Sequence, residues 1–267
     1  MAINRYELIS RHNPVLNSID YRSAMSIGNG EFAFTADITG LQTLYEEYND
    51  NMVPLCTMSQ WGWHTTPAYG NRYAYTFDDL VMTEYKYVDR TVTYAVECKP
   101  GNEDVYYWLR KNPHRFNLGR LGFLYKGKKI KQEDITDIKQ TLYLYEGILE
   151  STFKLFGTVC RVRTCCHYET DTIAVEAESE LFREGSLTVA LLFPYGSPEI
   201  NASDWNSGKL HESRIILEEN GTVCIERKMD KTQYYAWIRL EGNALLKRAG
   251  DHDFRIEAES DKLAFTL

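Results

Sequence analysis

The sequence predicts an all-β protein, built as a large antiparallel β-sandwich with few short helices. Apolar and polar residues alternate with a period of two through most of the chain. The alternating runs are rich in tyrosine, threonine, valine, isoleucine and phenylalanine, and turn residues separate them. With 267 residues, of which 43% are hydrophobic, the chain can bury one large core. We therefore expect a single β domain over residues 1–267.

The expected strands follow the chain in order. The first runs from Glu31 to Ala36, directly after a turn that contains two glycines. The later ones lie at residues 73–77, 82–88, 91–98, 121–125, 140–145, 148–155, 159–167, 172–179, 186–193, 213–218, 222–227, 234–240 and in two final runs within 254–267. Lys126-Gly127 and Asn220-Gly221 predict tight hairpin turns between neighbouring runs.

Residues 104–113 form the best helical candidate. Asp104 gives the first turn a negative charge, Arg110 and Lys111 lie near the end, and Pro113 stops the helix. Residues 133–138 provide at most one helical turn. Helices are therefore minor elements of the predicted fold.

Charge and hydropathy exclude several classes of function. The net charge is −8, and no basic stripe follows the chain, which argues against nucleic acid or an anionic membrane surface as the main partner. No apolar run approaches the ~18 residues that a membrane helix needs. The N-terminus lacks a signal-peptide pattern, so a cytoplasmic location is favoured for the chain as given. A periplasmic location stays open if a signal peptide has been removed.

The six cysteines match neither a disulfide scaffold nor a paired zinc motif. Cys160, Cys165, Cys166 and His167 are close in sequence, but strand alternation places Cys165 and Cys166 on opposite faces. We therefore expect apolar buried thiols, with no metal and no cofactor.

Two loops concentrate residues that are suited to binding. Residues 60–67 contain Trp61 and Trp63 in a stretch without apolar periodicity. Indole rings in loops often stack on the apolar faces of sugars, although the same pair could equally cover one end of the core. Residues 112–120 concentrate hydrogen-bond donors, either to lock that loop or to meet a neighbouring domain.

No catalytic acid–base pair can be assigned. The paired carboxylates Glu46-Glu47, Asp78-Asp79 and Glu218-Glu219 are adjacent in sequence. Neighbours on a strand point to opposite faces, whereas glycoside hydrolysis needs two carboxyl groups at a set separation. The predicted catalytic set is therefore empty.

Six short motifs are distinctive: Arg11-His12-Asn13-Pro14, residues 26–34 with Gly28-Asn29-Gly30, residues 146–155, Val162-Arg163-Thr164, residues 171–175 and residues 193–197. They resemble motifs of the N-terminal β domain of glycoside hydrolase family 65 and related enzymes, and residues 193–197 fit a bacterial branch. The resemblance covers most of the chain. It implies the galactose mutarotase-like supersandwich at the N-terminal end of a longer bacterial glycoside hydrolase or phosphorylase.

In that family a helical (α/α)6 barrel follows the β domain and carries the general acid, and no position of this chain matches it. The implied role is therefore non-catalytic, with an oligosaccharide substrate and the C-terminal barrel as partners and a homo-oligomer left open. Strand-like alternation continues to Leu267, which fits a domain cut from a longer protein. The resemblance implies that loops of the β domain reach the mouth of the barrel's active site. From their residue chemistry, Trp61, Trp63 and His64 are the candidates for carbohydrate binding at the rim of that sugar site. Arg115 and Asn117 are the candidates for domain docking.

Two other functions stay open. The same fold serves aldose 1-epimerases, which would use a carboxylate base and a histidine acid from this chain alone. A stand-alone carbohydrate-binding module would use Trp61 and Trp63 as its stacking platform.

Overall fold

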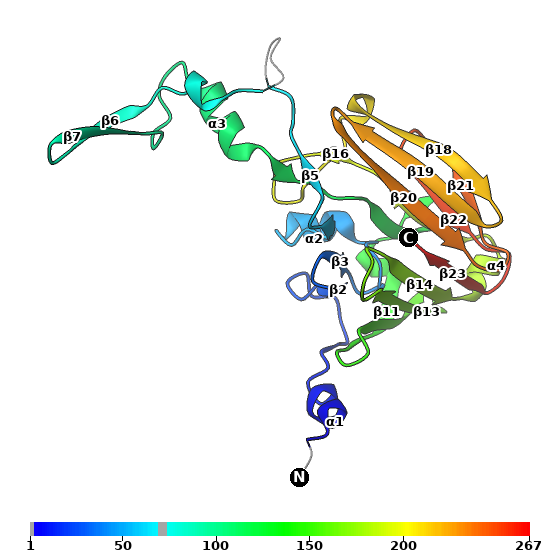
Figure 1. Cartoon of the computed structure of the whole chain (residues 1–267). Coiled ribbons are helices and arrows are strands. Elements are labelled where there is room, and N and C mark those ends of the chain that lie inside the picture. The colour runs from blue at the N-terminus through cyan, green and yellow to red at the C-terminus, as the bar shows by residue number, and fades with distance from the viewer. Residues whose placement is uncertain (1–2, 69–73) are drawn as a thin grey trace.

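The alternating runs assemble into antiparallel sheets in the computed structural model, which describes residues 3–68 and 74–267 (Figure 1). The two largest sheets contribute to one hydrophobic core. The predicted fold class, a large antiparallel β-sandwich with few short helices, is therefore confirmed.

The larger sheet has nine strands. In spatial order they are β1 (Val15–Leu16), β11 (Ile135–Tyr143), β12 (Ile148–Leu155), β13 (Thr158–Cys166), β14 (Ile173–Glu178), β23 (Lys262–Thr266), β20 (Thr232–Leu240), β19 (Thr222–Met229) and β18 (His211–Glu219). Every second side chain of β12 is buried, among them Leu149 and Phe153. The period of two in the sequence is thus the inward and outward alternation of this sheet.

The second sheet has five strands, whose inward side chains complete the core. In order they are β10 (Lys128–Lys129), β9 (Arg120–Tyr125), β15 (Leu187–Leu192), β22 (Asp253–Glu257) and β21 (Leu245–Arg248). Phe123, Val189 and Phe254 are almost completely buried between the sheets.

Smaller pairings and short helices connect these sheets. The additional strands are β2 (Met25–Gly28), β3 (Phe32–Ala36) and β4 (Thr57–Ser59) in one sheet, and the pairs β5 (Trp63–His64) with β8 (His114–Arg115), β6 (Thr83–Tyr87) with β7 (Arg90–Tyr94), and β16 (Tyr195–Gly196) with β17 (Ser203–Asp204). The helices are α1 (Arg5–Ser10), α2 (Tyr45–Asp50), α3 (Glu103–Lys111) and α4 (Glu180–Arg183), with 3-10 turns η1 (Phe77–Asp79), η2 (Gln132–Asp134) and η3 (Gly208–Leu210). No helix in the described part of the chain is long and apolar enough to cross a membrane.

Most of the local predictions from the sequence are confirmed. Helix α3 has the predicted acidic start and basic end. At both predicted hairpins the two turn residues have positive φ, as in Asn220 (51°) followed by Gly221 (74°). The strand predicted at residues 73–77 is wrong where the structure describes it. Residues 74–76 are irregular and η1 begins at Phe77, because the Asp79 carboxylate accepts hydrogen bonds from the backbone and side chain of Thr76. Tyr73 lies outside the described residues.

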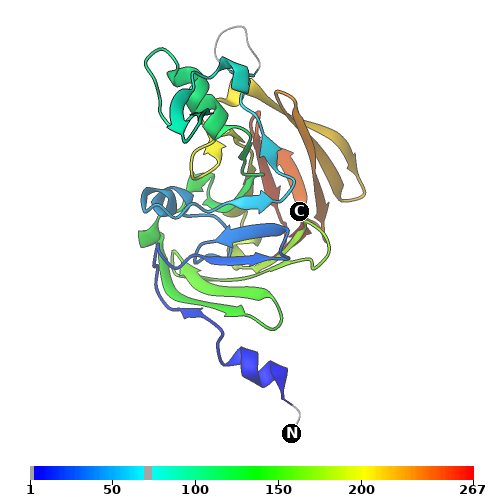
Figure 2. The same ribbon diagram turned by 60° about the vertical axis from the view of Figure 1, so that its left-hand side comes forward.

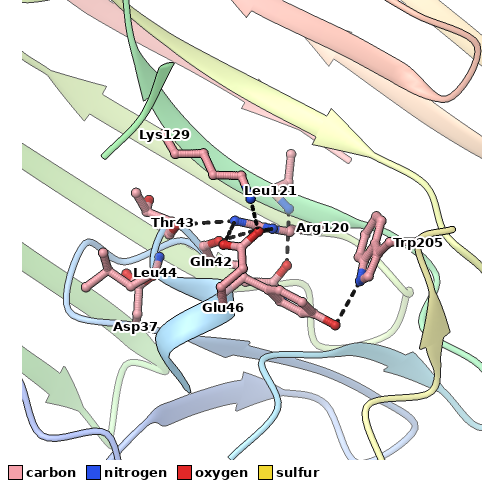
Figure 3. A network of polar contacts seen from close by, with 10 residues as sticks. Asp37, Gln42, Thr43, Leu44, Glu46, Arg120, Leu121, Lys129 and Trp205 are labelled. Carbon is pink, nitrogen blue, oxygen red and sulfur yellow. Dashed lines mark hydrogen bonds and ion pairs between the residues drawn. The ribbon is translucent and has the colours of Figure 1, made fainter. Parts of the chain in front are cut away.

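An ion-pair network links helix α2 to β9 and β10 (Figure 3). Arg120 donates to both carboxylate oxygens of Glu46, at 3.1 and 3.2 Å, and Lys129 donates to the same group at 2.5 Å. Burial alone would raise the pKa of Glu46, but the Arg120 guanidinium lowers it to about 2. The guanidinium carbon also lies 4.5 Å from the centre of the Tyr45 ring.

Asp37 anchors the loop that leads into α2. Its carboxylate accepts from the backbone N–H of Thr39 at 2.8 Å and from that of Leu44 at 2.6 Å. The side chain has no exposed surface, and burial raises its pKa to about 6 despite these hydrogen bonds. The loop therefore has a fixed shape where it crosses the end of the core.

A long excursion separates β5 from β8. The two short strands pair, Trp63 with Arg115 and His64 with His114, and close its base. Hairpin β6–β7 and helix α3 lie in this excursion and extend away from the sandwich (Figure 1). In the rotated view they lie at the end of the molecule opposite α1 (Figure 2). The part of the excursion that the structure describes, residues 65–68 and 74–113, is called the arm below.

Candidate functional site

A pocket of about 290 Å³ opens where two neighbouring strands of the large sheet diverge. Strand β20 pairs with β23 through Arg239 and Leu240, and the rest of its edge on that side has no partner strand among the described residues. The lining includes the β20 side chains Tyr234 and Trp237, and Trp61 contributes from the loop before β5. The pocket thus lies beside the part of the β20 edge that has no ladder pairing with β23, and aromatic rings line it.

Two tryptophans and Tyr235, which is 49% exposed, provide large exposed rings of this pocket. Trp61 is 47% exposed and Trp237 is 55% exposed. The Trp61 ring is supported from behind by Phe116, with ring centres 6.4 Å apart, and by Tyr234, at 5.8 Å. A half-exposed indole with a packed rear side offers a fixed flat surface to a ligand.

Asp171 fixes the orientation of the Trp61 ring. Its Oδ2 accepts from the indole Nε1 of Trp61 at 2.7 Å and from the hydroxyl of Ser59. Oδ1 accepts no hydrogen bond from any residue that the structure describes, so it stays available as an acceptor at the pocket. The arrangement places a carboxylate beside the edge of an aromatic platform.

The Gly28-Asn29-Gly30 turn holds the loop that carries Asp171. The Asn29 amide donates to the carbonyls of His167, at 3.2 Å, and Thr170, at 3.1 Å, while its carbonyl oxygen accepts from two backbone N–H groups of its own turn. A side chain at Gly28 would lie 2.3 Å from the carbonyl oxygen of Phe32, so only glycine fits there. This motif therefore has a structural role that supports the pocket.

A buried arginine supports the pocket wall. Arg227 has no exposed surface, and its guanidinium carbon lies 4.8 Å from the centre of the Phe193 ring, which lines the pocket. It donates to the ring Nδ1 of His211 at 2.6 Å and to the hydroxyl of Tyr234 at 3.4 Å. Burial, together with this cation, lowers the pKa of His211 to about 3, so this histidine stays neutral and can accept.

His64 lies inside the protein. It is 2% exposed, its Nδ1 lies 2.9 Å from the hydroxyl of Thr232, and its Nε2 lies 3.3 Å from a carboxylate oxygen of Asp230. Burial, together with the nearby His114, lowers its pKa to about 4, although Asp230 acts in the opposite direction. His64 therefore fixes strand β5 behind Trp61 and offers no surface to a ligand.

The remaining predicted site residues separate into an exposed pair and a buried amide. Trp63 is 49% exposed but does not line the pocket, and the Arg115 guanidinium carbon lies 4.3 Å from the centre of its ring. Asn117 is 1% exposed and accepts from the backbone N–H groups of Thr57 and Gly119. Trp63 and Arg115 are thus one surface feature, whereas Asn117 shapes the loops around the pocket.

Sequence reasoning missed two pocket residues, Trp237 and Asp171. The sequence pattern identifies Trp237 only as a strand residue, yet it falls on the outward side of β20 together with Tyr235 and Arg239. Large aromatics at the outward positions of an alternating strand are the signal that could have marked this surface. Asp171 has no comparable signal, because its partners are more than a hundred residues away in sequence.

No family model and no curated protein matches the chain. Among solved structures, it is similar to one described as "Putative kojibiose phosphorylase from human microbiome", with a TM-score of 0.53 and 9% sequence identity. The match covers 95% of this chain and 31% of that chain, so this chain spans about a third of its length. At this identity the likeness shows a shared fold: a β-sandwich that resembles one part of a larger carbohydrate phosphorylase.

Proposed function

We propose that this chain is a non-catalytic β domain of a larger carbohydrate-active enzyme, a glycoside phosphorylase or hydrolase. In this proposal its pocket holds a sugar unit at the rim of the enzyme's substrate site. The observation that carries the proposal is the pocket lined by Trp61, Trp237 and Asp171, in which the Asp171 carboxylate accepts from the indole of Trp61. The shared fold with part of a described phosphorylase supports the same class of enzyme.

The chemistry of the pocket fits a sugar ring. A pyranose has an apolar face of C–H groups and a rim of hydroxyls, which match a flat indole and nearby polar groups. Asp171 offers an acceptor, and the guanidinium of Arg239, 60% exposed, offers donors at the same pocket. The unpaired edge of β20 adds backbone donors and acceptors.

The exposed pair of Trp63 and Arg115 serves a second role in this proposal. Arg115 lines a shallow hollow beside the small side chains of β2 and β3, such as Ser26 and Ala33. A shallow hollow next to a cation–π pair suits contact with another domain of the same enzyme.

The test is a titration of the chain with a panel of glycosides that includes kojibiose, followed by tryptophan fluorescence and calorimetry. We expect a Kd of about 0.1–1 mM, and a loss of affinity of roughly tenfold or more in Trp61→Ala and in Trp237→Ala. Trp63→Ala is the matched control, because Trp63 is equally exposed but outside the pocket.

Absence of binding across the panel, or an equal loss in all three variants, would count against the pocket. Faster equilibration of the optical rotation of α-glucose or α-galactose on addition of the chain would favour an aldose 1-epimerase instead. The chain alone could bind sugar while Trp61→Ala and Trp237→Ala leave the kinetics of the full-length enzyme unchanged. That result would favour an independent binding module.

A further inference from the structure

A histidine side chain organises the loop that carries Asp171. This loop, residues 167–172, connects β13 to β14. Nδ1 of the His167 ring accepts hydrogen bonds from the backbone N–H groups of Glu169 and Thr170, each at 3.2 Å. The hydroxyl of Thr170 lies 2.9 Å from the same nitrogen. The loop therefore turns around one acceptor atom of the imidazole.

These contacts require one protonation state of the ring. Nδ1 accepts from N–H groups only through its lone pair, so the single proton of the neutral imidazole is on Nε2. A protonated imidazole has an N–H at both nitrogens, and its Nδ1–H would then face the backbone N–H groups of Glu169 and Thr170. Protonation of His167 thus removes the acceptor around which the loop turns.

The β2–β3 turn uses the same arrangement with an amide. There Oδ1 of Asn29 accepts from the backbone N–H groups two and three positions later, those of Glu31 and Phe32, at 3.0 and 2.8 Å. His167 repeats this spacing in its own loop. Asparagine is a usual residue for such turns, and its amide does not change charge when an imidazole does. A histidine at this position therefore adds a dependence on pH that an asparagine would not.

The hydrogen bonds of the loop extend to the pocket. The carbonyl of Thr170, the residue before Asp171, accepts from the backbone N–H of Thr172 at 2.7 Å. Asp171 in turn accepts from the indole of Trp61 at 2.7 Å, and these two residues and Thr172 line the pocket. His167 does not line it, so an effect of its protonation on a ligand is transmitted through Asp171.

We propose that His167 is a positioning residue for the pocket: its neutral form holds Asp171 beside Trp61, and its protonation weakens glycoside binding in mildly acidic solution. The inference rests on the proposed function, since it concerns the same sugar site. Imidazole is the side chain whose charge normally changes between about pH 5 and about pH 8. His167 is exposed, so a proton reaches the ring without any opening of the fold.

Few other groups near the ring change charge. The titratable and charged residues of the adjoining segments are Cys166, Tyr168, Glu169 and Asp171 on its own side and Glu31 on the β2–β3 turn. Among the described residues, no carboxylate forms an ion pair with His167, and the contact from the β2–β3 turn is the neutral amide of Asn29. His64, behind Trp61, stays neutral in mildly acidic solution, because burial lowers its pKa to about 4. A pH dependence that requires a histidine at position 167 therefore reports this ring.

The experiment is a fluorescence titration with kojibiose and the other glycosides of the panel at about pH 7.5 and about pH 5.0. Wild-type affinity should fall by about threefold or more on acidification, because the loop loses two hydrogen bonds. His167→Asn keeps a neutral acceptor and should bind like the neutral wild type at both pH values. His167→Ala has no acceptor and should bind weakly at both. His12→Asn, at another exposed histidine, is the matched control and should keep the wild-type pH dependence.

A second measurement needs no sugar. The NMR signal of the indole N–H of Trp61, assigned with Trp61→Phe, reports the hydrogen bond to Asp171. It should move on acidification in the wild type and stay in place in His167→Asn. If no glycoside binds but the signal behaves in this way, the proposed function fails and the positioning role of His167 stands.

Two results overturn the inference. One is an indole signal that follows the same pH course in the wild type and in His167→Asn. The other is a glycoside that binds His167→Ala as tightly as it binds the wild type at about pH 7.5. Either result leaves the sugar site itself intact, because Trp61→Ala and Trp237→Ala test that site separately.

Discussion

Replacement of His64 by glutamine should change how the stability of the fold depends on pH. Burial lowers the pKa of His64 to about 4, against 6.5 when the side chain is solvated. Between pH 4 and pH 6.5, His64 is therefore protonated in the unfolded chain but neutral in the folded chain. Stability is fully present above pH 6.5 and is lost as the pH falls toward 4.

The magnitude follows from the size of the shift. A difference of about 2.5 pKa units corresponds to a loss of roughly 3 kcal/mol in the free energy of unfolding at low pH. About 2 to 3 kcal/mol of this loss is already present at pH 4.5. Asp37 acts in the opposite sense. Because its pKa in the folded chain is about 6, Asp37 adds most to the free energy of unfolding below pH 3.8. This stabilising contribution falls as the pH rises to 6. Because Asp37 is present in wild type and variant alike, its effect cancels in the difference.

The assay is guanidinium unfolding of the wild type and of His64→Gln at several pH values from 4.5 to 7.5. The wild type should lose about 2 to 3 kcal/mol more than the variant over this range. His12→Gln, at an exposed histidine, is the control and should follow the wild type. Parallel curves for His64→Gln and the wild type would refute the burial argument.

Two further substitutions test the supports of the pocket. Asn29→Ala removes both hydrogen bonds to the loop of Asp171. The free energy of unfolding, measured by denaturation, should fall by roughly 2 kcal/mol, and glycoside affinity, measured by fluorescence titration, should weaken. Unchanged affinity would show that this turn does not support the pocket. Arg227→Met leaves the carbonyl of Pro194 and the Nδ1 of His211 without their buried donor, which should cost roughly 2–4 kcal/mol in thermal unfolding. A variant as stable as the wild type would show that the buried cation is dispensable.

The sandwich could be predicted from the sequence because its signals are local. Residues 148–155 alternate by two, and the structure has β12 over the same range with every second residue buried. Asn220-Gly221 is an almost unambiguous hairpin signal, since both residues adopt positive φ without strain from a branched side chain. The prediction failed at residues 74–77, because aromatic residues that alternate look like a strand even where a side-chain cap begins a helical turn.

The pocket could not be predicted in the same way, since it depends on where strand pairing stops. β20 alternates over its whole length, but it pairs with β23 at two positions only, and nothing in its local pattern marks that limit. The gap is lined by side chains from other parts of the chain, among them Trp61, which lies far away in the sequence. Trp61 in turn needs Asp171, and the loop of Asp171 needs Asn29. Each residue of this series has an ordinary local environment, so only the closed fold shows that together they line or support one pocket.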